Sequence, residues 1–462
     1  MKGGEDTGFS GFLSFSYVIK MAGIFKAYDI RGIYPESING TIAEKVGRAF
    51  ASVCGIKSAV VGRDMRISSV ELADGLIRGL TAAGVRVTDI GMCSTPVCYY
   101  SVGTLKTDGG IMITASHNPG CWNGFKFCLK DAYPVSNANG LKEIEQSFHL
   151  ENWQDAAVPG DVRYKNMTEE YGNYIRQFAK FDGKKLKVVC DFGNGMGRWE
   201  IAGIRDLFDL IPMYEEPDGN FPNHEANPLN LETLSDLCEK VRETGADFGV
   251  AFDGDADRSG FVDHHGRIIS MDLFTALIAS DILKTTGPAV VLYDLRSSRA
   301  VPEYIEEHGG TPVMTPVGHS FIKKKMRETN AVFAGELSGH YYFRENFCAE
   351  SQAMALVKFA NLICRTGKSA GELTEPLRRY FSTGELNFKV TDIPAVIQKV
   401  KDLYSVNGKM FEIDGLSGEY GDWRFNIRSS NTEPLLRLMV EADTEEKMEK
   451  CRDQLISVIS GQ

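Results

Sequence analysis

A unit of strand, polar loop, helix and strand occurs three times along this chain, and this repeat limits the possible fold more than any other feature. The copies begin near Ala59, Leu186 and Val290, and in each an apolar run is followed by a polar loop and then by apolar residues at helical spacing. That order is typical of a βαβ element. A chain of 462 residues is too long for one core. Three copies therefore predict three similar α/β domains in tandem.

Each third of the chain also contains a second apolar strand that leads into a polar loop. Open α/β sheets carry their chemistry at the carboxyl ends of strands, so the shared position predicts three loops that face one cleft. The strands and the loops that follow them are 111–113 before Ser116, 248–252 before Asp253, and 331–334 before Gly335.

The last part of the chain does not repeat this unit and predicts a smaller α+β domain, with strands near 386–390, 423–427 and 436–440. The fold class is therefore α/β, with three similar tandem domains of mixed sheet and a smaller C-terminal α+β domain around a central cleft. Residues 1–20 precede the first patterned segment and are interpreted as an extension. The predicted domains span residues 21–160, 161–266, 267–372 and 373–462.

The overall charge and the cysteines narrow the class of partner. A net charge of −11 argues against nucleic acid or a membrane surface, because no basic field is available to attract phosphate groups over a large area. No apolar run reaches the roughly 20 residues that a membrane-spanning helix needs. The ten cysteines form no Cys-x-x-Cys pair, which favours free thiols in a reducing cytoplasm. We therefore expect a cytoplasmic protein that is a monomer or a small homo-oligomer.

The strongest single motif is Asp253-Gly254-Asp255-Ala256-Asp257-Arg258. Alternate residues of an extended backbone point to the same side, and three carboxylates held so closely repel one another unless a cation lies between them. Their oxygens suit Mg²⁺ or Ca²⁺. An EF-hand needs Gly and Glu where this chain has Arg258 and His264, so it is excluded. A solvated acidic turn remains the alternative. Arg258 is placed to hold a phosphate oxygen.

Three further loops carry polar side chains suited to phosphate and sugar chemistry. Ser116 and His117 stand together where Pro119 ends a strand. The segment 335–340 offers a carboxylate, a hydroxyl and an imidazole for sugar hydroxyls, whereas 428–434 combines a guanidinium, hydroxyls and an amide that suit phosphate. Each loop taken alone is also consistent with an ordinary polar turn.

Taken together, these motifs resemble those of the α-D-phosphohexomutases, and within them the phosphomannomutase/phosphoglucomutase group. The resemblance rests on five motifs in the family's order and covers the chain from about Phe25 to Pro434 and beyond. It implies four domains around a central cleft, the first three alike, and the interconversion of hexose 1-phosphate and hexose 6-phosphate. The motifs are the segment 27–32 and the loops that contain Ser116, Asp253, Gly335 and Arg428.

The resemblance also implies a role for each matching residue. Ser116 would be a phosphoserine that donates and recovers the phosphoryl group, and one of its phosphate oxygens would bind Mg²⁺ together with Asp253, Asp255 and Asp257. A hexose 1,6-bisphosphate would be both the intermediate and the activator. The other catalytic residues would be His117, Lys126, Arg31 and His340, and the substrate would contact Tyr28, Arg258, Arg296, His319, Glu336, Ser338, His340, Arg428, Ser430, Asn431 and Thr432.

Three other functions remain open from the sequence. Phosphoglucosamine mutases share this chemistry but usually carry Gln where this chain has Leu337, which favours mannose or glucose phosphates as the small-molecule partners. A protein that binds sugar phosphates without turnover is the second alternative. The third is an acyl-phosphate phosphatase with Asp253 as nucleophile, although Asp257 stands where such motifs usually have Thr or Val.

Overall fold

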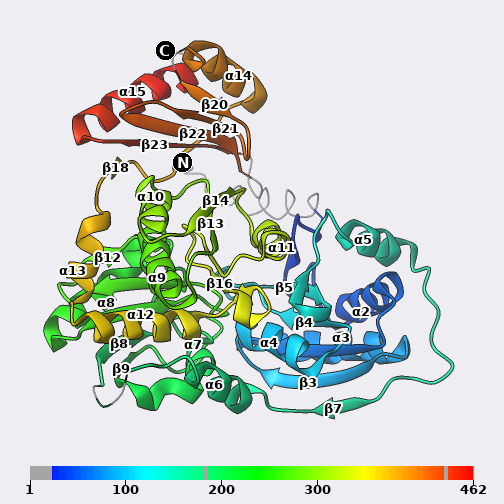
Figure 1. The fold of residues 1–462 in the computed structure, drawn as a ribbon. Helices are drawn as coiled ribbons and strands as arrows, with labels where there is room; N and C mark the ends of the chain where they lie inside the picture. The colour runs from blue at the N-terminus through cyan, green and yellow to red at the C-terminus, as the bar shows by residue number, and fades with distance from the viewer. Residues whose placement is uncertain (1–22, 182, 184, 407, 431–434, 461–462) are drawn as a thin grey trace, which may run out of the picture.

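The computed structural model describes residues 23–460 apart from residues 182, 184, 407 and 431–434. Figure 1 shows three domains side by side and a fourth, drawn in orange and red, that lies above the third. The predicted fold class, three tandem α/β domains followed by a smaller one, is confirmed. The predicted extension at residues 1–20 lies outside the described residues. None of the described helices has the length and apolar character needed to cross a membrane.

The first domain is built on a mixed sheet of seven strands: β1 (Ile30–Ile33), β2 (Ser58–Arg63), β3 (Arg86–Met92), β4 (Gly109–Ile113), β5 (Trp122–Leu129), β6 (Tyr133–Pro134) and β7 (Val162–Tyr164). Strands β2, β3, β4 and β7 run parallel, whereas β5 is antiparallel to both β4 and β1. Strand β4 is entirely buried, as expected of a central strand covered on both faces. Strand β7 lies just beyond the boundary predicted at residue 160.

Four helices accompany this sheet: α2 (Gly40–Cys54), α3 (Ser69–Ala82), α4 (Thr95–Leu105) and α5 (Leu141–Leu150). Asn39 caps the N-terminus of helix α2, where its side chain accepts hydrogen bonds from the first turn, and Gly55 in the left-handed region caps the C-terminus. Helices α2 and α3 can approach closely because Gly79 has no side chain. A Cβ atom at this position would lie only 2.0 Å from the carbonyl oxygen of Glu44. A larger residue there would push the two helices apart.

The second and third domains repeat the same arrangement with five strands each. The second contains β8 (Lys187–Asp191), β9 (Asp209–Met213), β10 (Phe248–Phe252), β11 (Ser259–Asp263), β12 (Ile268–Ile269) and the helices α6 (Thr168–Arg176), α7 (Gly197–Glu200) and α8 (Ser235–Thr244). The third contains β13 (Val290–Asp294), β14 (Thr311–Thr315), β15 (Phe333–Gly335), β16 (Tyr341–Phe343), β17 (Ala349–Glu350) and the helices α9 (Met271–Thr286), α10 (Ala300–Glu307), α11 (His319–Thr329), α12 (Gln352–Thr366) and α13 (Ala370–Thr374).

The three sheets share a strand order, which fixes the position of the polar loops. In the first three domains the orders are β5-β4-β2-β3, β11-β10-β8-β9 and β16-β15-β13-β14, and in each the last three strands are parallel while the first is antiparallel. The loop that precedes the antiparallel strand therefore leaves each domain at the same edge of the sheet. These loops are the ones that the sequence singles out.

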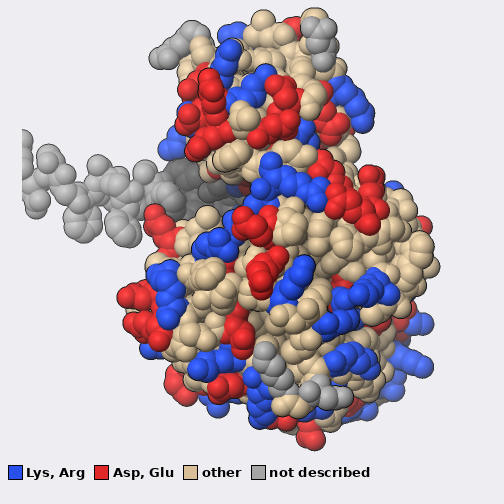
Figure 2. All heavy atoms as spheres, turned by 60° about the vertical axis from the view of Figure 1, so that its left-hand side comes forward, with Lys and Arg blue, Asp and Glu red and all other residues tan. Residues whose placement is uncertain are grey.

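The fourth domain is an antiparallel sheet covered on its outer face by two helices, α14 (Ile393–Tyr404) and α15 (Glu445–Ser460). Its strands are β18 (Phe381–Ser382), β19 (Leu386–Phe388), β20 (Lys409–Phe411), β21 (Leu416–Glu419), β22 (Trp423–Ser429) and β23 (Leu436–Ala442). Figure 2 shows this domain standing off the rest of the molecule above a narrower region, with acidic and basic side chains interspersed on the face drawn.

Two local expectations are wrong. In the sequence, apolar and polar residues alternate over 24–32 and predict a strand that runs into a loop carrying Tyr28 and Arg31. In the structure the strand begins only at Ile30, and Arg31 lies within it. The preceding residues turn, because the N–H of Lys26 bonds to the carbonyl of Asp29. The sequence also predicts a helix that follows the loop at 193–195 and continues through Leu207. In the structure this helix is interrupted, because α7 ends at Glu200 and a 3₁₀ segment follows at Ala202–Leu207.

Candidate active site

The three polar loops of the repeat meet at one place. They follow β4, β10 and β15, and their side chains touch across the domain boundaries. Ser116 Oγ donates a hydrogen bond to Asp253 Oδ2 at 2.8 Å, and His340 Nε2 lies 3.4 Å from Asp257 Oδ1. One side chain from each of the first three domains is therefore linked into a single polar cluster.

Ser116 is held in an unusual backbone conformation at the end of β4. Its φ angle is 52°, in the left-handed region, and its N–H donates to Thr114 Oγ1 at 2.9 Å. The hydroxyl is buried, and His117 Nδ1 lies 3.3 Å from Oγ. Burial and the charges of Arg258 and Arg31 hold the pKa of His117 well below its usual value. The imidazole beside Ser116 is thus neutral at pH 7.

Arg66 fixes the backbone of the Ser116 loop, and sequence reasoning missed it. Its fully buried guanidinium donates to the carbonyl oxygens of Ser116 (2.8 Å), Asn118 (2.6 Å), Pro119 (2.7 Å) and Trp122 (3.0 Å). A guanidinium has five N–H donors and can bond to several buried carbonyl oxygens at once. It therefore replaces the strand-to-strand hydrogen bonds that these carbonyls lack, so the loop can remain buried outside the sheet. Arg31 also donates to this loop, to the carbonyl oxygen of Ala115 at 3.3 Å and to Asn118 Oδ1.

The acidic loop is completely enclosed. Asp253, Asp255 and Asp257 are buried and offer oxygen atoms that lie within 4.8 Å of one another. Burial and the neighbouring carboxylates of Asp255 and Asp257 raise the pKa of Asp253 well above its usual value. Among the described residues, Oδ1 of Asp255 and Oδ1 of Asp257 are buried without a hydrogen-bond donor. Carboxylate oxygens left without donors are suited to a hard divalent cation, so this set of residues fits Mg²⁺.

Lys126 supplies the positive charge nearest to this cluster. It lies on β5, and its Nζ forms ion pairs with Asp255 at 2.6 Å and with Asp257. Burial disfavours the ammonium, but the carboxylates of Asp255 and Asp257 outweigh this and raise the pKa of Lys126. The lysine therefore stays charged. Strand β5 was not expected from the sequence, so Lys126 was singled out only through the family resemblance.

The loop after β15 places a charged histidine beside two acids. His340 Nδ1 lies 2.9 Å from Glu336 Oε2 and 2.9 Å from Ser338 Oγ, and Arg258 Nε lies 3.2 Å from His340 Nε2. Burial lowers the pKa of His340, but Asp257 and Glu336 raise it to about 9. Burial raises the pKa of Glu336, but its hydrogen bond with His340 lowers it to about 2. The pair is thus ionised at neutral pH.

Tyr28 and His319 form the aromatic side of the site. Their rings meet edge to face with centroids 5.6 Å apart. Burial, together with Lys323 and Lys126, lowers the pKa of His319, and its buried Nδ1 has no hydrogen-bond partner among the described residues. Burial and then the charges of Asp414 and Glu336 raise the pKa of Tyr28. Tyr28 is therefore within electrostatic reach of both the third and the fourth domain.

At the fourth domain, one carboxylate connects two arginines predicted to bind substrate. Glu385 accepts from Arg428 Nη2 at 2.6 Å, and its other oxygen lies 3.4 Å from Arg296 Nη1. Arg296 is also held by Asp294 at 2.6 Å. Arg428 Nε is buried without a partner among the described residues. An orphaned guanidinium N–H is a donor available to an anionic ligand.

The predicted phosphate-binding loop is described only in part. Arg428 was expected in this loop but lies in strand β22, where it pairs with Arg437 of β23. Ser430 follows that strand, and its N–H bonds to the carbonyl of Leu435. Asn431 and Thr432, which complete the predicted set, lie outside the described residues.

Arg66 and Glu385 are two polar residues of this region that the sequence did not single out. For Arg66 a signal was present, because Asp64-Met65-Arg66, directly after β2, has the same spacing as Asp294-Leu295-Arg296, which begins at the last residue of β13, and both arginines bond to the aspartate two residues before them. For Glu385 there was none, since its partners lie more than 40 residues away in the chain: Arg296 is 89 and Arg428 is 43 positions distant.

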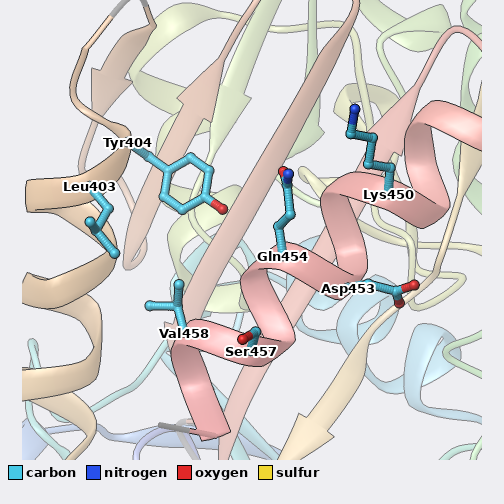
Figure 3. Close-up of a pocket in the computed structure, with 7 residues that line it drawn as sticks. All are labelled: Leu403, Tyr404, Lys450, Asp453, Gln454, Ser457 and Val458. Atoms are coloured by element: carbon cyan, nitrogen blue, oxygen red, sulfur yellow. The ribbon is translucent and has the colours of Figure 1, made fainter. Parts of the chain in front are cut away.

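Two hollows on the surface lie apart from the polar cluster. One, of about 740 Å³, is between α14 and α15 on the outer face of the fourth domain, where Tyr404 points toward Gln454 (Figure 3). The other, of about 880 Å³, lies beside α12 and includes Phe178, Lys358 and Arg365. Neither hollow is lined by a residue predicted for the site.

Comparison with known proteins gives the class to which this fold and this site belong. Four family models match in order: phosphoglucomutase/phosphomannomutase alpha/beta/alpha domain I at residues 22–155, domain II at 169–266, domain III at 270–380 and the C-terminal domain at 385–458. These ranges follow the four domains seen in the structure. The fold is therefore that of a four-domain protein of the phosphoglucomutase/phosphomannomutase type.

Individual relatives agree over nearly the whole chain. The phosphohexose mutases of Xanthomonas campestris are 39% identical, covering 94% of this chain and 98% of theirs. The phosphomannomutase of Methanocaldococcus jannaschii is also 39% identical, covering 95% of this chain and 97% of its own. A crystal structure of a phosphoglucomutase/phosphomannomutase family protein from Burkholderia thailandensis is 33% identical, covers 95% and 97% of the two chains, and superposes with a TM-score of 0.88. The chain belongs to the phosphoglucomutase/phosphomannomutase family.

Proposed function

We propose that this enzyme interconverts hexose 1-phosphates and hexose 6-phosphates, with mannose, glucose or both as the sugar, through a phosphoserine at Ser116 and a hexose 1,6-bisphosphate intermediate. The observation that carries the proposal is the hydrogen bond from Ser116 Oγ to Asp253 at 2.8 Å, inside a cluster of three buried aspartates. Ser116 faces acids that suit a metal ion, which a stored phosphoryl group requires.

Charge neutralisation is the main task in phosphoryl transfer. Asp253, Asp255 and Asp257 would hold Mg²⁺, which when bound would offset the charge of the phosphoryl oxygens. Arg258 and Lys126 add fixed positive charge from the chain itself. In the first step the bond between phosphorus and Ser116 Oγ breaks, and a bond forms to the free sugar hydroxyl. In the last step the other phosphate of the bisphosphate returns to Oγ.

The protonation of two histidines fits the last step, in which the phosphate returns to Ser116. Neutral His117 would accept the proton of the Ser116 hydroxyl, since its Nδ1 lies 3.3 Å from Oγ. Burial lowers the pKa of His340 but Asp257 raises it to about 9, so protonated His340 would donate a proton to the sugar oxygen that leaves. In the first step the same protons would move in the opposite direction. The Glu336 carboxylate would accept hydrogen bonds from sugar hydroxyls, and the Ser338 hydroxyl would donate to or accept from them. Glucose and mannose differ only at C2, and contacts to the other hydroxyls would not distinguish them. We therefore expect the enzyme to use both sugars.

The phosphate that does not react would be held at the fourth domain by Arg428, Ser430, Asn431 and Thr432. The bisphosphate must turn over between the two transfers, which exchanges the ends that face Ser116. Reorientation needs room, and movement of the fourth domain would provide it.

The substrate is tested by assaying glucose, mannose and glucosamine 1-phosphates with glucose 1,6-bisphosphate as primer. The proposal expects turnover of glucose and mannose phosphates within about tenfold of each other, since a pocket without a specific contact discriminates weakly. Glucosamine phosphate should be the poorest of the three. Preferred turnover of glucosamine phosphate would identify a phosphoglucosamine mutase instead. Absence of turnover with all three, despite sugar-phosphate binding, would indicate a non-catalytic binding protein.

A further inference from the structure

A buried carboxylate lies where the first three domains join, outside the cluster of aspartates. Glu200, at the end of α7 in the second domain, is 1% exposed. Its Oε2 accepts from Ser94 Oγ of the first domain at 2.6 Å. Its Oε1 accepts from Ala353 N of the third domain at 2.9 Å and from Tyr171 OH at 2.8 Å. One carboxylate thus bonds to all three domains.

The partners of Glu200 in the first and third domains lie at the N-termini of helices. Ser94 is the N-cap of α4, and Ser351, whose hydroxyl lies 2.6 Å from Tyr171 OH, is the N-cap of α12. A helix N-terminus carries partial positive charge and free N–H groups, so a carboxylate is stabilised between two of them. In the described part of the chain, the hydrogen bonds of Glu200 involve no lysine or arginine. The helix ends and hydroxyls therefore take the place of a cation.

The next residue in each of these turns holds the acidic loop. Thr95, after Ser94, donates from Oγ1 to Asp255 Oδ2 at 2.6 Å and from its N–H to the Asp255 carbonyl at 3.0 Å. Gln352, after Ser351, donates from Nε2 to the Asp257 carbonyl at 2.7 Å. Gln352 Oε1 also accepts from Ser259 Oγ at 2.6 Å. The acidic loop is therefore held from two sides by residues whose neighbours bond to Glu200.

We propose that Glu200 is a positioning residue for the metal site: it ties α4 and α12 to the second domain and thereby fixes Asp255 and Asp257 in the geometry that binds Mg²⁺. The proposal rests on the proposed metal role of the three aspartates. It assigns a function to a residue that does not touch substrate or metal. Loss of the carboxylate leaves the two helix ends without their common acceptor. Thr95 and Gln352 are then held less firmly, and their hydrogen bonds to the acidic loop weaken.

Asp272 provides a matched control in the third domain. It is also buried, and burial raises its pKa as it does that of Glu200. It accepts hydrogen bonds from Ser270 Oγ, Leu273 N and Ser298 N. All of these partners belong to the third domain, and none of them bonds to the acidic loop. Substitution of Asp272 should therefore lower stability without changing the metal site.

The first test is Mn²⁺ binding to the full-length protein, followed by electron paramagnetic resonance. Changes outside the ligand sphere weaken metal binding by about 10- to 100-fold, so Glu200→Ala should bind Mn²⁺ about tenfold more weakly than the wild type. Glu200→Gln should lose less, because its amide oxygen can still accept from Ala353 and its amide nitrogen can donate to Ser94 Oγ. Asp272→Ala should keep wild-type affinity. Wild-type affinity in Glu200→Ala would overturn the proposal.

The second test does not depend on any metal. Hydrogen–deuterium exchange in metal-free protein should become faster in Glu200→Ala and Glu200→Gln at residues 94–97 and 253–258, and unchanged there in Asp272→Ala. If the wild type bound no Mn²⁺, the metal role of the aspartates would be wrong, while this exchange pattern would still report the link from Glu200 to the loop. Unchanged exchange at both segments in the Glu200 variants would overturn the link itself.

Discussion

The two ends of the proposed site are built from different interactions. At the reacting end, one apolar core continues through the first three domains, from Val60 and Val97 through Phe252 to Phe359. At the other end, the fourth domain has a core of its own, around Phe425 and other buried residues of its sheet and helices. A shared core resists relative movement of domains, whereas separate cores permit it.

Contacts between the third and fourth domains are rich in charge. Glu441 of β23 accepts from the N–H of Arg299 at 3.0 Å, Asp414 accepts from Val317 N at 3.3 Å, and Glu385 approaches Arg296. Although Glu441 and Arg296 are buried, a polar interface between domains permits relative movement more readily than a large apolar one. The comparison suggests a rigid reacting end, where the phosphoryl group and metal must be aligned, and an adjustable end that grips and releases the second phosphate.

The largest effect is expected at the rigid end, from Asp255→Asn. The change removes a proposed ligand and leaves Lys126 without one of its two carboxylates. Since residues outside the ligand sphere already contribute about 10- to 100-fold, Mg²⁺ affinity should fall by at least about a hundredfold. Calorimetric titration with Mg²⁺ measures this, with Asp272→Asn as the control. Equal Mg²⁺ affinity in both variants would mean that Asp255 is not a metal ligand and that the metal does not bind at the reacting end.

A second effect concerns the junction that makes this end rigid. Burial raises the pKa of Glu200 from 4.5 to about 7, although Ser94 and Ala353 lower it. A carboxyl whose pKa is raised on folding binds more protons in the folded state, so its contribution to stability is greatest below pH 4.5 and is lost as the pH rises to about 7. The free energy of unfolding of the wild type, relative to Glu200→Gln, should therefore fall by about 3 kcal/mol over this range.

Urea unfolding of the two proteins at several pH values between these limits measures that difference. Glu200→Gln carries no titratable group at this position, so it cancels the contribution of all other carboxyls. A difference that stays constant with pH would mean that Glu200 titrates normally in the folded protein.

The smallest of these effects is expected at the adjustable end, from Glu385→Gln. Glu385 orients Arg428 and leaves its Nε free of partners among the described residues. Loss of one charge-assisted hydrogen bond should raise KM for the hexose phosphate by about tenfold. Mg²⁺ affinity should not change, because the contact lies at the other end. Steady-state kinetics and Mg²⁺ titration separate the two. A change in Mg²⁺ affinity would show that the two ends are not independent.

The sequence was sufficient for the architecture because each element of the repeat has a local signal. Apolar strands, polar loops and helical spacing lie within about 30 residues of one another in a βαβ unit. The same signal predicted that the loops of Ser116, Asp253 and Glu336 face each other. The prediction for residues 24–32 was wrong because the alternation of apolar and polar residues there is typical of a strand. In the structure, a backbone turn before Ile30 determines the local conformation.

Apart from Arg66, the residues that support the site have no local signal in the sequence, because their partners are distant in the chain. Glu200 bonds to Ser94, 106 positions away, and to Ala353, 153 positions away. Nothing beside Glu200 in the sequence distinguishes it from an acid on the surface of a helix. Arg428 misled for a related reason: its serine-rich neighbours resemble a loop, while pairing with β23 keeps it in a strand.

The central claim is that Ser116 stores the phosphoryl group, and labelling tests it most directly. The protein is incubated with glucose 1,6-bisphosphate carrying labelled phosphate, digested, and the labelled peptide is mapped, with Ser116→Ala as the control. The account predicts one phosphate on Ser116 that is stable to hydroxylamine and absent from Ser116→Ala, which should also lack turnover. A hydroxylamine-labile phosphate on Asp253, or full turnover by Ser116→Ala, would contradict it.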